Sequence, residues 1–289
     1  MSVEKPSPWS RLTSRLFCLL QYLLPQHTLS RLVARLAEAE TPWLRNLLIN
    51  QAVRHFDIDI SEAEYTSTAD YASFNDFFTR ALKPGLRPIA TGEDVIVAPA
   101  DGTISQRGDI TAGCFFQAKG HTYPLEQLLA DEQLATRFHA GRFSTVYLSP
   151  RDYHRVHMPV AGKLVEARYI PGKLFSVNPL TVAGVPNLFA RNERLICHFD
   201  TERGPVCVIL VGALLVAGIE SVWHGHYAPG KPCHEHFATP IPYAKGAEIG
   251  RFKFGSTVIL LMPMNHALNP DIDEGAAIKM GESLAQGTC

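Results

Sequence analysis

The sequence has no long apolar run, no regular cysteine spacing and almost no net charge. Its longest apolar run, Val206–Ile219, spans fourteen residues and includes two glycines, short of the ~18–20 residues that a membrane-spanning helix needs. Val and Ile dominate its first half, which favours a buried strand. The six cysteines form no Cys-x-x-Cys pair, so we expect no disulfide framework and a reducing compartment. A net charge of −1 gives no electrostatic footprint for nucleic acid, and we expect no such partner.

The N-terminal segment differs from the rest of the chain in its charge. Residues 1–56 contain seven Lys or Arg and three Glu, a net charge of +4, which leaves −5 for the remainder. Leucines recur at the helical period before Pro25, and apolar residues repeat in the same way over 29–36 and 42–56. Amphipathic helices of this kind suit an anionic membrane surface. They suit a helical cap on the main domain equally well, so the residues alone leave both interpretations open.

The pattern of apolar and turn-forming residues changes near residue 85. Residues 71–87 predict one more short helix that ends at Pro84–Gly85. Beyond it, Val- and Ile-rich runs alternate with Gly, Pro and Asp, which is typical of strands joined by turns. These runs are 95–97, 145–148, 164–170, 206–216 and 258–262. We expect an α+β protein with a helical segment at 1–85 and a β-rich core at 86–289.

The Gly255–Ser256 step lies just before one of the predicted strands, in the sequence RFKFGSTVI. A serine hydroxyl can attack the carbonyl of the residue before it and shift that acyl group from nitrogen to oxygen. Gly255 would leave this carbonyl unhindered and would tolerate a strained backbone. Elimination from the resulting ester would leave dehydroalanine, which hydrolyses to a pyruvoyl group. By itself the step is more typical of a simple turn.

Two histidines and one aspartate are further candidates for catalysis. His154 and His157 are three residues apart in LSPRDYHRVHMP, and a neutral histidine is suited to moving protons at cellular pH. Asp101 follows an apolar run in VAPADGTIS, where it could orient a histidine as in a Ser-His-Asp arrangement. Taken separately, the histidines could be ordinary surface or core residues, and Asp101–Gly102 could be a turn.

Together, APADG, YHRVHMP and FGST resemble the pyruvoyl-dependent phosphatidylserine decarboxylases, and most closely the membrane-associated bacterial form. The segments FNDFFTR, KPGLR, PGKLFSVN, LFARNER and VGALLVAGIE support the resemblance, which extends from about residue 40 to the C-terminus. The family usually has Leu where this chain has Phe254. The residue is still apolar, and we expect cleavage to be retained.

The resemblance implies a role for each candidate residue. Ser256 would be the nucleophile of a self-cleavage after Gly255 and would become the covalent pyruvoyl cofactor. His157 would activate Ser256, Asp101 would orient His157, and His154 would act in decarboxylation. The products would be a β chain, 1–255, and an α chain, 256–289, which remain together. The pyruvoyl carbonyl would form an imine with the serine headgroup and act as an electron sink, so no metal is expected.

The same resemblance implies substrate, location and assembly. The substrate would be phosphatidylserine in the membrane, and the products phosphatidylethanolamine and CO2. We expect a homodimer that associates peripherally with the cytoplasmic side of the cell membrane, where the basic helical segment would meet anionic lipid.

Three other functions remain as alternatives. A serine hydrolase with a triad of Asp101, His157 and Ser256 would keep an intact chain, but the G-x-S-x-G elbow is missing. A non-enzymatic lipid-binding module would not need Ser256. A pyruvoyl enzyme could also act on a soluble amino acid. Residues 224–236, HGHYAPGKPCHEH, have the composition of a zinc or copper site, but their spacing matches no standard closed site, and we expect an exposed loop.

Overall fold

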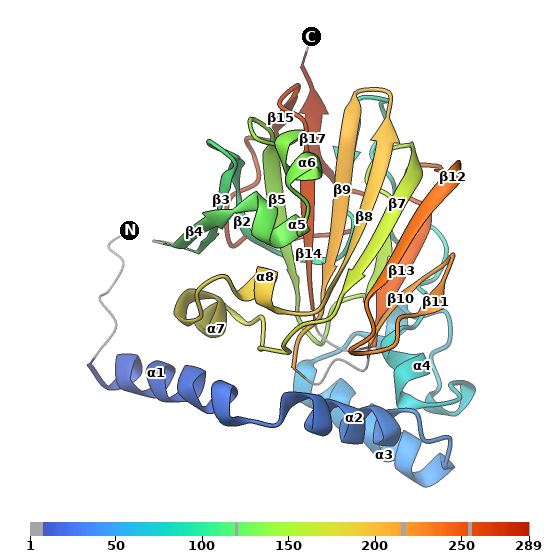
Figure 1. The fold of residues 1–289 in the computed structure, drawn as a ribbon. Helices are drawn as coiled ribbons and strands as arrows, with labels where there is room; N and C mark the ends of the chain where they lie inside the picture. The colour runs from blue at the N-terminus through green and yellow to red at the C-terminus, as the bar shows by residue number, and fades with distance from the viewer. Residues whose placement is uncertain (1–7, 119–120, 215–217, 254–255, 289) are drawn as a thin grey trace.

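The structure, a computed structural model, describes residues 8–118, 121–214, 218–253 and 256–288. Its N-terminal part is helical, and these helices lie together beneath one end of the β-rich body (Figure 1). They are α1 (Pro8–Leu23), α2 (Gln26–Ala37), α3 (Pro42–Phe56) and α4 (Phe74–Phe78), with 3-10 turns η1 (Ile60–Glu62) and η2 (Thr68–Asp70) between the last two. Across the described segments, every helix is too short or too polar to cross a membrane.

The helix predicted for residues 71–87 is much shorter than expected. It covers only Phe74–Phe78. Ser73 caps its start, since the Ser73 side chain accepts a hydrogen bond from the backbone N–H of Asp76 at 3.2 Å. At its end the Thr79 hydroxyl donates to the Asn75 carbonyl at 2.9 Å, and Leu82 then forms a β-bridge with Ala63. The chain beyond Thr79 is therefore held by tertiary pairing that sequence periodicity does not report.

The largest sheet has eight antiparallel strands in the order β12-β7-β8-β9-β14-β5-β2-β16. Its strands are β12 (Cys233–Tyr243), β7 (Gly162–Ile170), β8 (Arg194–Thr201), β9 (Gly204–Val211), β14 (Ser256–Met262), β5 (Arg142–Leu148), β2 (Gly102–Asp109) and β16 (Ala277–Ile278). The strand predicted over 206–216 ends earlier than expected, at Val211. Just beyond it, the backbone N–H of Gly212 donates to the carbonyl of Glu193 at 2.9 Å, which continues the register of β9 with β8 by one residue.

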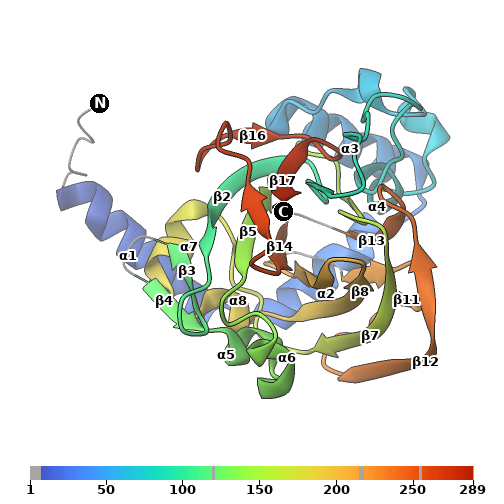
Figure 2. The ribbon, with the colours of Figure 1, turned by 90° about the horizontal axis from the view of Figure 1, so that it is seen from above.

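Three smaller sheets complete the β structure, and in the view from above the large sheet curves around several of their strands (Figure 2). One has four strands: β11 (Gly225–His226), β10 (Ile219–Ser221), β13 (Glu248–Phe252) and β6 (Arg155–His157). A second has β1 (Val95–Val97), β17 (Ser283–Gly287) and β15 (His266–Leu268), and a hairpin pairs β3 (Cys114–Ala118) with β4 (His121–Pro124).

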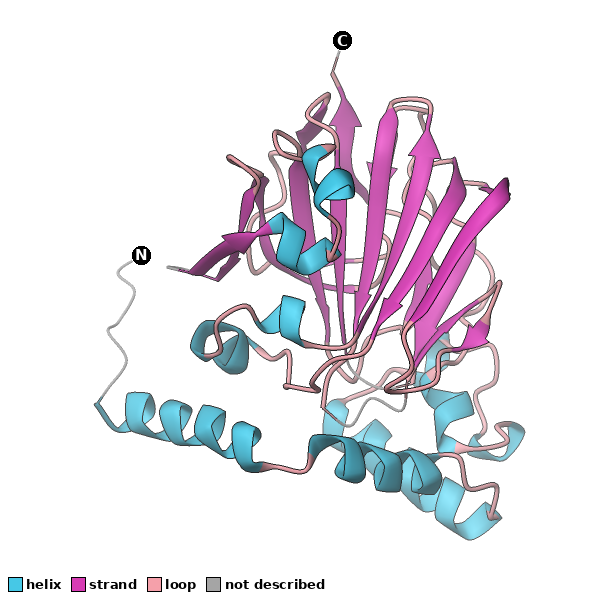
Figure 3. Cartoon of the chain, viewed as in Figure 1, coloured by secondary structure: helices cyan, strands magenta, loops and turns pink. Residues whose placement is uncertain are grey.

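Strand β14 is buried on both faces. Its residues alternate between two hydrophobic clusters: Val258 and Leu260 belong to the cluster facing the smaller sheets, and Ile259 and Leu261 to the opposite one. Short helices cover the second face (Figure 3). They are α5 (Leu125–Leu129), α6 (Glu132–Thr136), α7 (Pro179–Gly184) and α8 (Leu188–Arg191). Burial on both faces explains why this strand is continuously apolar rather than alternating.

The predicted α+β architecture is confirmed, because N-terminal helices precede a β-rich body. A third hydrophobic cluster joins α3 and α4 through residues such as Ile49, Phe74 and Phe77. The boundary between segments 1–85 and 86–289 stays a prediction.

Candidate active site

Ser256 is the first residue of β14 and lies in the interior of the protein. It is 0% exposed and pairs with Leu148 at the end of β5. Its hydroxyl oxygen has no hydrogen-bond partner. A buried hydroxyl normally finds a partner, so this atom is unusual. Gly255, on the other side of the predicted cleaved bond, lies outside the described residues.

A tight turn carries the chain from β5 to the histidines. The Asp152 carboxylate accepts hydrogen bonds from the backbone N–H of Ser149 at 2.7 Å and from its hydroxyl at 2.9 Å. The following strand, β6, pairs with β13, and the carbonyl of His154 accepts a bond from the N–H of Phe252 at 3.0 Å. The turn after β5 therefore leads from the partner of Ser256 to His154, just before β6, and to His157 within β6.

His157 is held by two hydrogen bonds that fix its ring. Nδ1 lies 2.8 Å from the carbonyl oxygen of Gly246, which can only accept, so Nδ1 carries the proton. Nε2 lies 3.0 Å from the Tyr153 hydroxyl and accepts from it. Burial raises the pKa of Tyr153 to about 12, which keeps that hydroxyl protonated. Burial also lowers the pKa of His157, against weaker opposing effects of the Gly246 hydrogen bond and nearby carboxylates. The geometry therefore presents a neutral imidazole with its lone pair on Nε2.

The Asp101 carboxylate is bound by other groups than His157. Arg87 donates to it from Nε at 2.9 and 3.0 Å and from Nη2 at 2.6 Å, and the N–H of Met280 donates at 2.8 Å. Both ring nitrogens of His157 are already occupied, so the expected direct Asp101–His157 hydrogen bond is absent from this structure. Tyr153 and Gly246 orient the ring instead. Asp101 acts on His157 only through its charge, which contributes a small rise in the pKa of the imidazole.

His154 is fully buried, and neither of its ring nitrogens has a hydrogen-bond partner. Its ring lies 4.1 Å, centroid to centroid, from that of Phe78. Burial, and to a lesser degree the charge of Arg80, place the pKa of His154 well below its ordinary value. The ring is therefore neutral at cellular pH.

Arg80 and Asn75 are two further buried polar residues that our interpretation of the sequence did not select. Arg80 is 4% exposed. Its Nη2 donates to the Arg151 carbonyl at 3.2 Å, but Nε and Nη1 have no partner. Asn75 is 5% exposed and both atoms of its side-chain amide are unpartnered. Both residues lie in the FNDFFTR segment, whose aromatic residues predict a buried helix. An arginine and an asparagine in such a helix were the signal in the sequence that could have identified them.

A cavity of about 260 Å³ adjoins this group. Arg80, Asp101 and Tyr153 line it, so it connects the unpartnered arginine with the surroundings of His157. Its walls also include Arg87, Arg151 and Lys279 beside several carboxylates. Arg87 and Lys279 are paired with these carboxylates, whereas Arg80 keeps unpartnered N–H groups that suit a small anionic group.

Comparisons with known proteins identify the family of this chain. A family model described as phosphatidylserine decarboxylase matches residues 74–286, and a second, described as PSD, matches residues 16–57. The chain belongs to the phosphatidylserine decarboxylase family. A phosphatidylserine decarboxylase proenzyme of Alcanivorax borkumensis is 51% identical, with 96% of this chain and 98% of that protein covered. A proenzyme of the same name from Pseudomonas aeruginosa is 52% identical, with 94% and 96% covered, and one from Francisella philomiragia is 51% identical, with 94% and 98% covered.

The family membership confirms the resemblance drawn from APADG, YHRVHMP and FGST. It does not test the individual roles of Asp101, His154, His157 and Ser256, which stay predictions. The structure connects Ser256, at the start of β14, to the segment of His154 and His157 through β5 and the turn that follows it, and it gives Asp101 a separate set of partners.

The burial of His154 predicts a pH dependence of stability. Because its folded pKa lies below the unfolded value of about 6.5, the unfolded chain binds the proton first as pH falls. The stability it contributes is therefore present above about pH 6.5 and is lost progressively below it. In His154→Gln, the slope of unfolding free energy against pH between about 5 and 6.5 should decrease by up to about 1.4 kcal/mol per pH unit.

Urea unfolding of wild type and variant at several pH values measures this slope. The matched control is His236→Gln, whose imidazole is exposed on β12, and its slope should stay that of wild type. An unchanged slope in His154→Gln would show that His154 is not buried in a neutral state.

Proposed function

We propose that this protein decarboxylates phosphatidylserine to phosphatidylethanolamine and CO2 with a pyruvoyl group that it makes from its own Ser256. The observation that carries the proposal is the unpartnered, fully buried hydroxyl of Ser256 at the start of the central strand. Ser256 pairs with the end of β5, and the chain that follows β5 leads to two buried histidines whose pKa values burial lowers. The proenzyme names of the relatives also support a processed chain.

The surroundings of Ser256 fit conversion of this side chain to a pyruvoyl group. Its hydroxyl makes no hydrogen bond that the conversion would break. A pyruvoyl carbonyl supplies the electron sink for the carbanion that decarboxylation leaves. Attack of the Ser256 hydroxyl on the Gly255 carbonyl requires a base, and His157 carries a free-base Nε2 for that purpose once Tyr153 releases it. His154 is the neutral group we assign to proton transfer during decarboxylation.

Cleavage at this site would leave the α chain, 256–289, bound to the β chain, 1–255. Its first seven residues form β14, which pairs with β9 on one side and β5 on the other. All seven are buried, so dissociation would expose a continuous apolar strand to water. The two chains would separate only on unfolding. A homodimer is also part of the proposal, and it rests on the family resemblance alone.

Arg80 is our candidate for binding an anionic part of the phosphatidylserine headgroup. Leaving a buried guanidinium with two unpaired groups is costly, and an anion at Nε and Nη1 would relieve that cost through charge-assisted hydrogen bonds. Arg80 lines the cavity and its charge lowers the pKa of His154, which supports an anion-binding position close to that histidine.

The N-terminal helices supply the surface for peripheral association with the cytoplasmic leaflet. Of the sixteen exposed large apolar side chains in the described chain, eleven lie between residues 16 and 47. They include Leu19, Leu23, Leu32 and Trp43, with exposures of 59, 75, 56 and 68%. An apolar surface of this extent accompanied by Arg31 and Arg35 favours an interfacial, anionic lipid environment.

Self-processing is tested by the intact mass of the freshly purified, denatured protein. Wild type should give two species that divide after Gly255, with the smaller lighter than the unmodified 256–289 peptide by the mass of one ammonia molecule. Ser256→Ala should give one uncut, inactive chain, because it lacks the attacking hydroxyl, and Ser283→Ala is the processed and active control. A single uncut chain in active wild-type protein would instead support a hydrolase or a lipid-binding module.

The Arg80 assignment predicts a loss of activity without a loss of processing. Arg80→Met should lower kcat/KM for phosphatidylserine about ten- to a hundredfold, since a hydrogen bond to a charged group is worth about 1.5–3 kcal/mol. The cleaved mass pattern should persist, and Arg137→Met, an exposed arginine paired with Asp200, should keep wild-type kinetics. The same variant is then assayed with a serine ester that lacks phosphate. If kcat/KM is still lowered, Arg80 binds the carboxyl region of the headgroup; if kcat/KM equals that of wild type, Arg80 binds the phosphate. Unchanged kinetics with phosphatidylserine would refute the assignment.

The membrane surface is tested by vesicle sedimentation. Leu19→Ser/Leu23→Ser/Leu32→Ser should bind vesicles containing phosphatidylserine at least about tenfold more weakly, since burial of each leucine contributes about 1.5–3 kcal/mol. Met264→Ser, equally apolar and 64% exposed in the turn after β14, should bind as wild type does. Equal binding by the triple variant would contradict this surface.

A further inference from the structure

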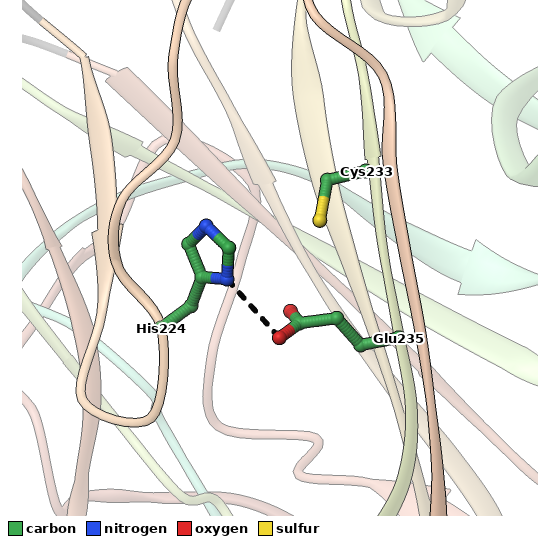
Figure 4. Close-up of side chains that lie close together, drawn as sticks. All are labelled: His224, Cys233 and Glu235. Carbon is green, nitrogen blue, oxygen red and sulfur yellow. Dashed lines mark hydrogen bonds and ion pairs between the residues drawn. The ribbon is translucent and has the colours of Figure 1, made fainter.

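Three potential metal ligands from the histidine-rich segment converge where two sheets approach each other. Cys233 and Glu235 are two residues apart on β12 and lie on the same face of that strand, and His224 lies in the turn between β10 and β11. One donor atom from each lies within 4.8 Å of the other two, and the three side chains point toward one another (Figure 4).

Neighbouring side chains hold the imidazole and the carboxylate in place. The Tyr227 hydroxyl donates to Oε2 of Glu235 at 2.8 Å, which leaves Oε1 facing Nδ1 of His224 at 3.1 Å. The rings of His224 and Tyr227 stack with centroids 4.3 Å apart and planes 7° apart. The N–H of His224 donates to the Ser221 hydroxyl at 3.2 Å. Outer contacts of this kind orient the ligands in protein metal sites.

We propose that His224, Cys233 and Glu235 bind one Zn²⁺ ion. Sulfur, imidazole nitrogen and carboxylate oxygen are the donors that zinc takes in proteins. Among the described residues the cluster holds three ligands, so water would complete a tetrahedral site. On binding, the thiol of Cys233 would release its proton to solvent and form a Zn–S bond, and the His224 proton would move to Nε2, freeing the Nδ1 lone pair.

The metal site would connect the edges of two sheets that are not paired with each other by backbone hydrogen bonds. Strand β12 is at one edge of the eight-stranded sheet, and β11 is at one edge of the four-stranded sheet. A metal ion bridging them would fix the β10–β11 hairpin to β12. Strand β10 pairs with β13, and β13 with β6, which carries His157. We therefore assign the ion a structural role, separate from the decarboxylation chemistry.

The other histidines of this segment supply matched controls. His234 lies between the two ligands on β12, but its Nε2 contacts the Glu166 carboxylate at 2.8 Å. His226 lies against Gly218. Cys114, half-buried on β3, is a second thiol of comparable exposure.

The test uses full-length protein, freed of metal with a chelator and titrated with Co²⁺ as a spectroscopic substitute for Zn²⁺. We expect one Co²⁺ per chain with a thiolate-to-cobalt absorption band, displacement of the band by Zn²⁺, and a melting temperature that rises with Zn²⁺ concentration. Cys233→Ser and His224→Ala should lose the band, whereas His234→Ala and Cys114→Ser should keep it.

A second measurement needs no variant. Zn²⁺ should protect Cys233, but not Cys114, from alkylation by iodoacetamide, as read by peptide mass mapping. Absence of the band in wild type, its persistence in Cys233→Ser, or equal alkylation of Cys233 with and without Zn²⁺ would overturn the proposal.

Discussion

The arrangement of this protein depends on one strand that is buried on both faces. Strand β14 lies between β9 and β5, and its residues enter hydrophobic clusters on both sides of the large sheet. Ser256 begins this strand, so its hydroxyl is carried into the interior by the burial of the apolar residues that follow it. Removing those residues from water stabilises the strand, and that stabilisation outweighs the cost of one unpaired hydroxyl. The position of the candidate nucleophile is thus a consequence of the core.

Several buried polar groups of the α4 segment, the histidine segment and β14 lack hydrogen-bond partners. Native interiors pair nearly all their buried polar atoms, yet Arg80, Asn75, His154 and Ser256 all carry unpaired ones. Desolvation and the charge of Arg80 keep His154 neutral. By contrast, the nearby Asp101 is fully bonded to Arg87 and Met280. The unpaired N–H groups of Arg80 at the cavity wall indicate a site prepared for a ligand, whereas the Asp101 network indicates a fixed support.

The N-terminal helices combine the two interpretations that their sequence left open. Gln21 and Gln26 are buried, and their side-chain oxygens accept hydrogen bonds from the N–H groups of Ser176 at 2.8 Å and Leu174 at 2.9 Å. Lys253 bonds Glu38 of the helical part at 2.9 Å. One side of the helices is therefore a cap on the core. The other side carries the exposed leucines on which the membrane proposal depends, so a cap and a membrane surface are compatible.

The sequence by itself determined the fold class and the family, and it predicted Gly255–Ser256 as a cleavage site. Local periodicity and contiguous motifs carry that information: the strand over 258–262, for example, is contained in β14. Only the tertiary structure decided which groups meet. In the structure, His157 hydrogen-bonds Tyr153 and Gly246 rather than Asp101, and the helix predicted over 71–87 covers only Phe74–Phe78. The charge of Arg80 also acts on His154. These outcomes depend on pairing between residues far apart in the chain, and a short-range pattern does not encode such pairing.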